Sequence, residues 1–314
     1  MLIKLLLLIL GLALVVAGAN ILVEGASAFA RRFGVSEFVI GLTIVGFGTS
    51  LPELVVSVTG ALQGNSAIAI GNVVGSNLFN VLFILAVSAL VSPIVITRSN
   101  HYRDIPITLA ATVLVVALGM AGNGLSRIEG AVMLALFACY ILYCFRSDKP
   151  EETPEDAGAA STQMSAFLAV TMILGGLSGL IFGGRLFVNS AEDVALMLGV
   201  SDKFIAITVL AMGTSLPEFV TSIVALSKQK SQMALGNILG SNVFNLLLIL
   251  GTSALISPMS FASMSMIDMS ALVLSALMVF LSIYIGKKNL IDRLDGSMML
   301  LAFAAYMVWL FIKL

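Results

Sequence analysis

Two copies of the six residues Gly-Thr-Ser-Leu-Pro-Glu bring a carboxylate, two hydroxyls and a proline into an otherwise apolar chain. They lie at 48–53 and 213–218. Thr49, Ser50 and Glu53 are spaced i, i+1 and i+4, so a helix would place both hydroxyls on the face of the carboxylate. The second copy repeats this arrangement with Thr214, Ser215 and Glu218. Each copy therefore offers several oxygen atoms to one ligand.

A second repeated motif, Gly-Asn-x-x-Gly-Ser-Asn-x-Phe-Asn, adds amide oxygens and further hydroxyls. Its first copy places Asn72, Ser76 and Asn80 at four-residue spacing, which predicts one polar stripe along a helix. The second copy supplies Asn237, Ser241 and Asn245. Calcium takes six to eight oxygen ligands of these kinds, whereas softer metals recruit cysteine or histidine. The inventory indicates a hard cation, and two glutamates balance one calcium ion or two sodium ions.

The surroundings make these residues costly unless they serve a ligand. A proline in a helix interior costs about 3 kcal/mol, and a carboxylate near the centre of a bilayer costs roughly another 3 kcal/mol. Pro52 also leaves a carbonyl without its helical donor, and such backbone survives in a membrane only against protein or a wet cavity. We therefore expect both motifs to face inward rather than to serve packing alone.

The elements that position these residues are predicted to be membrane-spanning helices. The chain has 314 residues, of which 59% are hydrophobic and only 11% charged, and its mean hydropathy is +1.09. A span needs about 20 largely apolar residues. The sequence divides into ten such segments, at 2–25, 35–62, 67–92, 104–121, 128–145, 164–190, 200–227, 232–257, 266–286 and 295–313. The predicted fold class is an all-α membrane protein with ten transmembrane helices.

The two halves of the chain are related by a gap-free internal repeat. A shift of 165 residues aligns 41–80 with 206–245 and leaves 18 of those 40 positions identical. Each half then has five spans, and because five is odd the halves enter the membrane from opposite sides, an arrangement common in transporters. We predict a first five-helix repeat at 1–145, a linker at 146–163 and a second repeat at 164–314. Helices 2 and 7 are expected to be broken at the membrane midplane.

The positive residues predict the orientation. With the amino terminus outside, the cytoplasmic loops hold eleven of them and the outer side four, which follows the positive-inside tendency. The eleven are Arg31, Arg32, Arg98, Arg103, Arg146, Lys149, Lys228, Lys230, Lys287, Lys288 and Arg293, and the four are Lys4, Arg127, Lys203 and Lys313. We expect a multi-pass protein of the cell (inner) membrane with both termini outside and the 146–163 loop cytoplasmic.

At these motifs the sequence resembles the sodium/calcium exchanger family of the calcium/cation antiporters, in its prokaryotic form. The resemblance covers nearly the whole chain. It implies that the cation ligands include two main-chain carbonyls, from Gly46 and Ala211. It implies side-chain ligands at Thr49, Ser50, Glu53, Ser76, Asn80, Thr214, Ser215, Glu218, Ser241 and Asn245.

One position departs from many relatives, which have aspartate where this chain has Asn245. The site then holds two acids rather than three, which favours sodium-for-calcium exchange without potassium. We expect the exchange to be electrogenic, with more than two sodium ions moved per calcium. A calcium/proton antiporter is the alternative, and a cation channel is less favoured because a channel needs a continuous multi-site pore.

No pairing of a nucleophile with a base is visible in the spans, so no catalytic residues and no enzyme activity are expected. We expect no cofactor apart from the transported Ca²⁺ and Na⁺. The expected partners are these ions and the lipid bilayer, with no nucleic acid and no obligatory protein partner.

Overall fold

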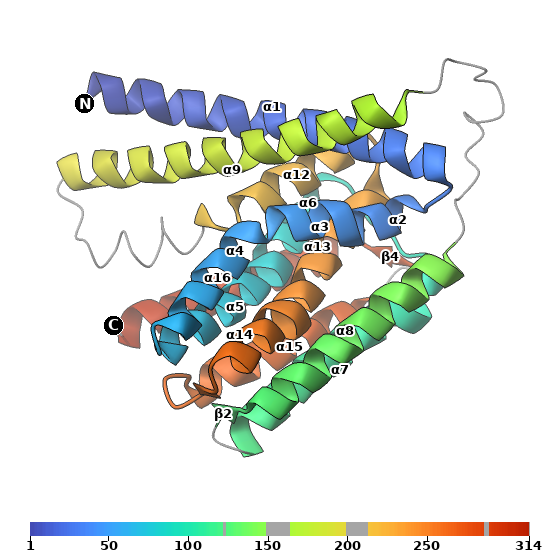
Figure 1. Ribbon diagram of the computed structural model, residues 1–314. Helices are drawn as coiled ribbons and strands as arrows, with labels where there is room; N and C mark the ends of the chain where they lie inside the picture. Colours follow the sequence, from blue (N-terminus) through green and yellow to red (C-terminus); the bar gives the residue numbers. More distant parts are fainter. Residues whose placement is uncertain (122–123, 149–163, 199–212, 286–288, 314) are drawn as a thin grey trace. The chain divides into compact units, whose positions relative to one another are not determined.

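A computed structural model describes residues 1–121, 124–148, 164–198, 213–285 and 289–313, and these residues are almost entirely helical (Figure 1). The chain forms two compact units, and each takes segments from both sequence halves. Unit 1 comprises Met1–Thr49 and Ile141–Asn237, and unit 2 comprises Ser50–Tyr140 and Ile238–Leu314. These units differ from the predicted repeats, whose boundaries describe sequence similarity rather than compactness.

Unit 1 is built around two long helices that lie side by side and antiparallel, α1 and α9 (Figure 1). Its other helices pack against this pair or against one another. The helices are α1 (Leu2–Phe33), α2 (Glu37–Ile40), the π-helical η1 (Gly41–Val45), α3 (Gly46–Thr49), α9 (Ala166–Met197), α12 (Leu216–Ser227) and the first half of α13 (Ser231–Val243).

Glycines set the close approach of α1 and α9. A Cβ atom added at Gly18 would lie 2.8 Å from the Gly176 carbonyl oxygen, and one added at Gly176 would lie 2.6 Å from the Leu22 nitrogen. Both distances are to backbone, which cannot swing aside, so the helices can meet this closely only where side chains are missing. This small-residue contact is a common means of helix packing in membranes, where lipid competes for apolar surface.

Unit 2 contains the remaining helices and two short pairs of strands that tie connecting segments together. Strands β1 (Ile94–Val95) and β4 (Leu290–Ile291) pair antiparallel, as do β2 (Gly124–Leu125) and β3 (Met259–Ser260). The helices are α4 (Leu51–Leu62), α5 (Ser66–Phe79), η2 (Asn80–Leu85), α6 (Ala86–Val91), η3 (Asn100–Asp104), α7 (Ile105–Ala121), α8 (Arg127–Ser147, whose last turns belong to unit 1), the end of α13, η5 (Phe244–Ile249), α14 (Leu250–Ile256), α15 (Met266–Ser282) and α16 (Arg293–Lys313).

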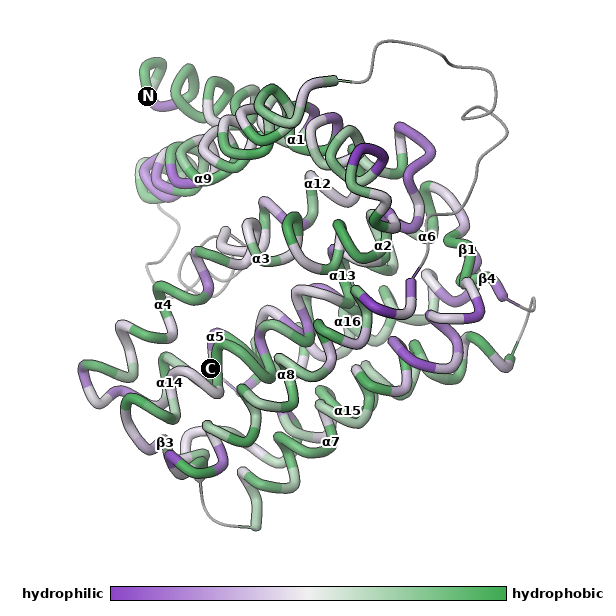
Figure 2. The backbone as a smooth tube through the Cα atoms, turned by 45° about the vertical axis from the view of Figure 1, so that its right-hand side comes forward, coloured by the Kyte–Doolittle hydropathy of each residue, from purple (hydrophilic) through white to green (hydrophobic). Residues whose placement is uncertain are grey.

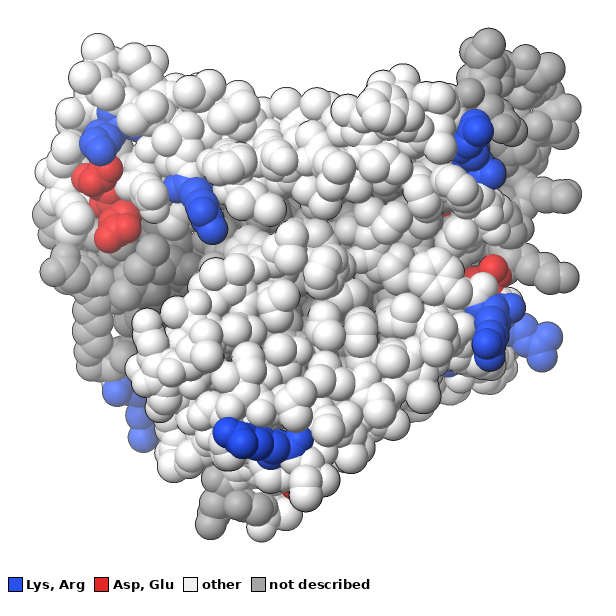
Figure 3. Space-filling model, viewed as in Figure 1, with Lys and Arg blue, Asp and Glu red and all other residues white. Residues whose placement is uncertain are grey.

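The predicted all-α membrane fold is confirmed by the described helices. Seven continuous helices are long and apolar enough to cross a membrane, and the bent pair Glu37–Thr49 and Leu51–Leu62 makes an eighth. Two shorter apolar helices, Leu216–Ser227 and Met266–Ser282, lie where the seventh and ninth spans were predicted, and the start of the seventh is outside the described residues. The long helices are hydrophobic along most of their length (Figure 2), and the described surface in Figure 3 is almost free of charge apart from a few small groups.

The predicted helix break is present in the first half and its geometry recurs in the second. The chain bends by 52° between Thr49 and Leu51. Ser50 at the bend has φ −84° and ψ 6°, and Ser215 has φ −89° and ψ 6°. The prolines that follow, Pro52 and Pro217, fall in the first turn of α4 and α12, where a missing N–H leaves no helical hydrogen bond unmade.

The α1–α9 contact can be tested with two adjacent glycines. Gly176→Ala should destabilise the protein by about 1–3 kcal/mol, because its methyl group meets the backbone of α1. Gly175→Ala is the matched control, since no described atom lies within 4 Å of its added Cβ and alanine is the better helix former. Thermal unfolding in detergent measures both. Equal unfolding temperatures for the two variants would contradict the close contact.

Candidate cation-binding site

Glu53 and Glu218 occupy equivalent, buried positions just after the two breaks. Each lies in the first turn of its helix, α4 or α12, and each is 1% exposed. The N-terminus of a helix carries partial positive charge, which stabilises a nearby carboxylate by about 0.3–1 kcal/mol at exposed sites and more when buried. The break therefore does more than turn the chain, because it provides a helix N-terminus beneath each carboxylate.

An asparagine from the second motif is hydrogen-bonded to the main chain of each glutamate. The Asn72 side-chain nitrogen donates to the Glu53 carbonyl oxygen at 3.1 Å and to Ser57 Oγ at 2.9 Å. In the second half the same atom of Asn237 donates to the Glu218 carbonyl oxygen at 3.2 Å and to Ser222 Oγ at 2.9 Å. The sequence predicted Asn72 in a polar stripe with Ser76 and Asn237 in the equivalent stripe with Ser241, but both amide nitrogens turn towards the glutamate backbone.

The hydroxyls of the first motif are also buried. Thr49 and Ser50 are at most 2% exposed. The Thr49 hydroxyl lies 3.3 Å from the Gly46 carbonyl oxygen and 3.2 Å from Asn237 Oδ1 and donates to these acceptors. In the second motif Ser215 is fully buried and Thr214 is partly exposed. Ala211, the second expected carbonyl ligand, lies outside the described residues.

Three further predicted ligands carry buried polar atoms that make no hydrogen bond to any described residue. They are Asn80 through Oδ1, Ser241 through Oγ, and Asn245 through both Oδ1 and its side-chain nitrogen. All three residues are at most 1% exposed, and Ser76 is 3% exposed. A buried polar group without a partner costs about 1–3 kcal/mol. A bound cation would complete the bonding of these three, although residues outside the predicted set, among them Asn77 and Asn242, also have a buried oxygen without a described partner.

Both asparagines at the end of the second motif lie in π-helical turns. Asn80 is the first residue of η2, and Asn245 is the second residue of η5. The π-helical segments therefore overlap at equivalent residues of the two repeats. π-turns are rare and are frequently found at functional sites. The helix pattern of the sequence did not predict them, although the recurrence of Phe-Asn at 79–80 and 244–245 marks the place.

Within each unit, packing brings some of the predicted ligands onto neighbouring elements. In unit 2, α4 packs against both α5 and η5. Glu53 lies in α4, Ser76 in α5 and Asn245 in η5. In unit 1, α3 packs against α12, so the helix that ends at Thr49 adjoins the helix of Glu218. Each unit thus contains one buried glutamate with hydroxyls or amides on adjoining helices.

The donor set is made of oxygen atoms. Among the described residues, no group of three or more His, Cys, Asp or Glu side chains gathers where it could hold a metal ion. The predicted charge for a cation is that of Glu53 and Glu218, supplemented by neutral hydroxyl, amide and carbonyl oxygens. This pattern suits weakly held, exchangeable hard cations better than a permanently bound transition metal.

Sequence reasoning missed Ser57 and Ser222. Both are fully buried, and each accepts a hydrogen bond from the asparagine described above. Ser57 Oγ also donates to the Ala69 carbonyl oxygen at 3.3 Å, which links α4 to α5. The sequence did contain a signal for them, because serine occurs at this position in both copies of the repeat.

Comparison with known proteins identifies the family. The sodium/calcium exchanger protein family matches residues 3–146 and 168–312. The chain belongs to this family. It is 35% identical to the putative antiporter CaxA of Alkalimonas amylolytica over 99% of both chains, and 33% identical to the sodium/calcium exchanger MaX1 of Methanosarcina acetivorans over 98% of both. The solved structure of the sodium-calcium exchanger NCX_Mj, soaked with Na⁺ and Ca²⁺, matches with a TM-score of 0.84, 31% identity and 98% coverage of each chain.

Membership of the exchanger family confirms the resemblance that the motifs indicated. The match to the solved exchanger structure confirms the predicted architecture of ten transmembrane helices in two inverted repeats. It also makes the chain a multi-pass membrane protein of a transporter family, a cation antiporter rather than an enzyme.

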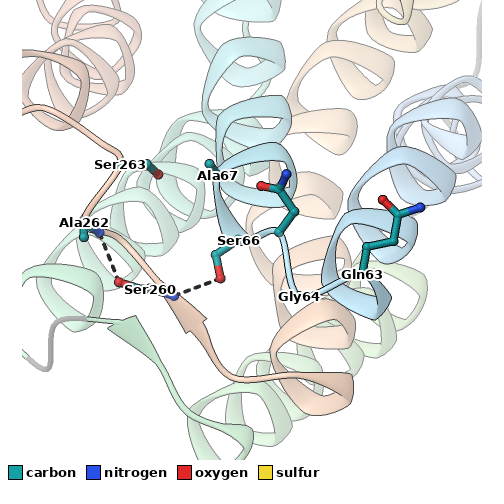
Figure 4. Close-up of a pocket in the computed structure, with 8 residues that line it drawn as sticks. Gln63, Gly64, Ser66, Ala67, Ser260, Ala262 and Ser263 are labelled. Carbon is teal, nitrogen blue, oxygen red and sulfur yellow. Dashed lines mark hydrogen bonds between the residues drawn. The ribbon is translucent and has the colours of Figure 1, made fainter.

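A surface pocket in unit 2 of the exchanger is distinct from these residues. It has a volume of about 470 Å³ and lies at the turn between α4 and α5, beside the segment that follows β3 (Figure 4). Ser66 Oγ accepts from the Ser260 nitrogen at 3.2 Å, and Ser260 Oγ accepts from the Ala262 nitrogen at 3.3 Å. No charged residue lines the pocket, and two of its hydroxyl oxygens already accept hydrogen bonds from backbone nitrogens. The pocket therefore lacks the character of a cation site.

The unpartnered amide of Asn245 gives a test of the site without any transport assay. Asn245→Leu should stabilise the cation-free protein by about 1–3 kcal/mol, because a buried polar group without a partner is removed. The same change should abolish the stabilisation produced by added calcium or sodium. Thermal unfolding with and without these ions measures both effects.

Asn100→Leu is the matched control. Asn100 is fully buried but accepts from the Thr97 nitrogen and hydroxyl, and it donates to Asp104. This substitution should destabilise the protein and leave cation-induced stabilisation in place. If Asn245→Leu also destabilises the cation-free protein, its amide has a partner there and is not held open for an ion.

Proposed function

We propose that this chain exchanges sodium for calcium across the membrane, through one oxygen-lined site near the membrane midplane that uses both Glu53 and Glu218. The observation that carries the proposal is the pair of glutamates at equivalent helix breaks, each 1% exposed. Their two negative charges balance one calcium ion or two sodium ions, so either cargo neutralises the same site. The names of MaX1 and NCX_Mj as sodium/calcium exchangers support the assignment of the ions.

The proposed ligands combine the carboxylates with neutral oxygens. The unpartnered atoms of Asn80, Ser241 and Asn245 support their inclusion. The burial of Thr49 and Ser50 supports that of the hydroxyls. The full proposed set is Gly46, Thr49, Ser50, Glu53, Ser76, Asn80, Ala211, Thr214, Ser215, Glu218, Ser241 and Asn245.

We further propose that the protein resides in the cell membrane with both termini outside. The distribution of eleven positive residues against four supports this orientation. Calcium leaving the cell would then move from the side of Arg31 and Lys228 to the side of Lys4. Sodium entering down its gradient supplies the free energy.

Calcium flux in proteoliposomes tests the exchange and its two acids. Sodium-loaded vesicles should take up calcium, and uptake should cease when the sodium gradient is collapsed, while an imposed proton gradient should not replace it. Glu53→Gln and Glu218→Gln should each reduce uptake to background, because each removes half of the charge that balances calcium. Glu24→Gln serves as the control, since that glutamate is 57% exposed and pairs with Lys228.

Two results would overturn the proposal. Calcium uptake driven by protons but not by sodium would assign the chain to calcium/proton exchange. Near-normal uptake by both glutamine variants would show that the two buried acids do not form the transport site.

The charge balance also predicts a response to voltage. Neutral oxygens around the two carboxylates can hold a third sodium ion, and exchange of one calcium for three sodium ions moves one positive charge per cycle. Each net charge is worth about 2.3 kcal/mol per 100 mV. Calcium efflux should therefore accelerate when vesicles are clamped negative inside with potassium and valinomycin. Efflux that is independent of the clamped voltage would indicate two sodium ions per calcium.

A further inference from the structure

Asn72 and Asn237 form the same pair of hydrogen bonds in the two halves of the chain. Each side-chain nitrogen has two hydrogens, and it directs one to the carbonyl oxygen of the glutamate and one to the serine a turn later. The four distances lie between 2.9 and 3.2 Å. The two copies of the repeat are less than half identical in sequence, yet both keep the two hydrogen bonds. The arrangement is therefore a shared structural feature of the two repeats. We call each set of asparagine, serine and glutamate carbonyl a clamp.

The clamp adds a hydrogen bond from another span to a glutamate peptide near the end of its helix. Glu53 and Glu218 lie in the first turn, where helix N–H groups lack intrahelical partners and the backbone frays most easily. A carbonyl oxygen has two lone pairs, so it can accept from the asparagine as well as within the helix. The second donor comes from another span, so it holds the glutamate peptide, and with it the carboxylate, against α5 or α13.

Asn237 uses its remaining polar atom as well. Its Oδ1 accepts from the Thr49 hydroxyl at 3.2 Å. A hydroxyl that binds a cation does so through an oxygen lone pair, and its hydrogen must point elsewhere. An acceptor such as Asn237 Oδ1 therefore turns the lone pairs of Thr49 away from itself. Asn237 is 1% exposed, and protein atoms engage both of its amide hydrogens and its amide oxygen.

We propose that Asn72 and Asn237 are positioning residues for cation binding, which hold Glu53 and Glu218 in place without touching the ion. This inference rests on the proposed function, because it assigns the glutamates to a cation site. It requires a neutral amide at both positions, since only an N–H₂ group can donate to a carbonyl and a hydroxyl at once. Partners that orient ligands in this way typically change metal affinity about 10- to 100-fold when they are removed.

The positioning role and direct coordination by Asn237 predict opposite effects of Asn237→Asp on calcium affinity. If Asn237 bound the ion directly, replacement by aspartate would add a carboxylate to a calcium site and would keep or tighten binding. If Asn237 acts through the clamp, aspartate removes both donors and places an oxygen against the Glu218 carbonyl oxygen, so binding weakens. A purely structural asparagine would change the unfolding temperature and leave the calcium dependence unchanged.

The experiment compares Asn237→Asp and Asn72→Asp with Asn77→Asp in the full-length protein. Asn77 is the control because it is 2% exposed, lies in α5 with Asn72, and directs its amide nitrogen to Val73 of its own helix rather than to the glutamate segment. Calcium is titrated against thermal unfolding, and the half-saturating calcium concentration and maximal rate of flux are measured in proteoliposomes. Hydrogen exchange of the backbone amides at 53–57 and 218–222 reports on the clamp itself, whatever the transported ion.

We expect the half-saturating calcium concentration to rise about 10- to 100-fold in both clamp variants, with faster hydrogen exchange in the matching segment. Asn77→Asp should keep the wild-type calcium dependence. Ser57→Ala and Ser222→Ala, which remove one acceptor each and add no charge, should give smaller changes of the same sign if an aspartate variant fails to fold. Unchanged or tighter calcium binding in Asn237→Asp, or unchanged hydrogen exchange, would overturn the clamp.

Failure of the proposed function would look different. The wild-type protein would then show no sodium-dependent calcium flux, while the clamp variants would still exchange hydrogen faster at the glutamate segments. A wild type that exchanges calcium, together with clamp variants that bind calcium normally, would refute the clamp and leave the proposed function intact.

Discussion

The burial of two carboxylates inside a membrane protein is the constraint on which the rest of this structure depends. An acid near the bilayer centre costs roughly 3 kcal/mol even on insertion scales, so Glu53 and Glu218 must be surrounded by protein and given compensating contacts. The helix breaks provide part of this, because each acid lies at a helix N-terminus. The asparagines of the next span provide another part, by holding the glutamate backbone in both halves. In unit 1 the helix of Glu218, α12, packs against α1, which itself lies in close glycine contact with α9.

The two sequence repeats are not the two compact units, and the difference has a physical reason. Thr49, at the end of the first broken helix, bonds to Asn237 in the second half. A Cβ added at Gly236 would lie 2.3 Å from the Phe38 carbonyl oxygen, so α2 and α13 also meet backbone to backbone within unit 1. Each half therefore completes its packing with segments of the other. Neither repeat has the contacts of an independent domain, although the repeat is what the sequence displays.

Much of the fold was predictable because strong local rules apply to it. The ten apolar segments follow from hydropathy, and Pro52 and Pro217 indicate the breaks because a proline ring excludes the preceding turn of helix. The π-turns at Asn80 and Asn245 were not predictable, since they depend on which side-chain and backbone groups meet between helices. The roles of Ser57 and Ser222 were hidden for a similar reason, as a serine in a span most often bonds to its own helix. Asn72 shares helical spacing with Ser76, but spacing cannot tell which end of an amide faces the glutamate.

The turns that follow α4 and α12 show how one backbone design serves two environments. In the first turn the Asn65 nitrogen donates to the Gly60 carbonyl oxygen, and in the second the Lys230 nitrogen donates to Ala225, both at 2.8 Å. The middle residue is left-handed in each, with φ 71° at Gly64 and 60° at Gln229.

The charges of the two turns nevertheless differ. Lys228 and Lys230 pair with Glu24 and Glu37, whereas the first turn has neutral residues at the matching positions, Gln63 and Asn65. The backbone of equivalent turns in the two repeats is therefore alike while their charges differ, and of these two turns only the second contains lysines. The two copies of the repeat share their backbone and their buried oxygen atoms, and they differ in the charges of these turns.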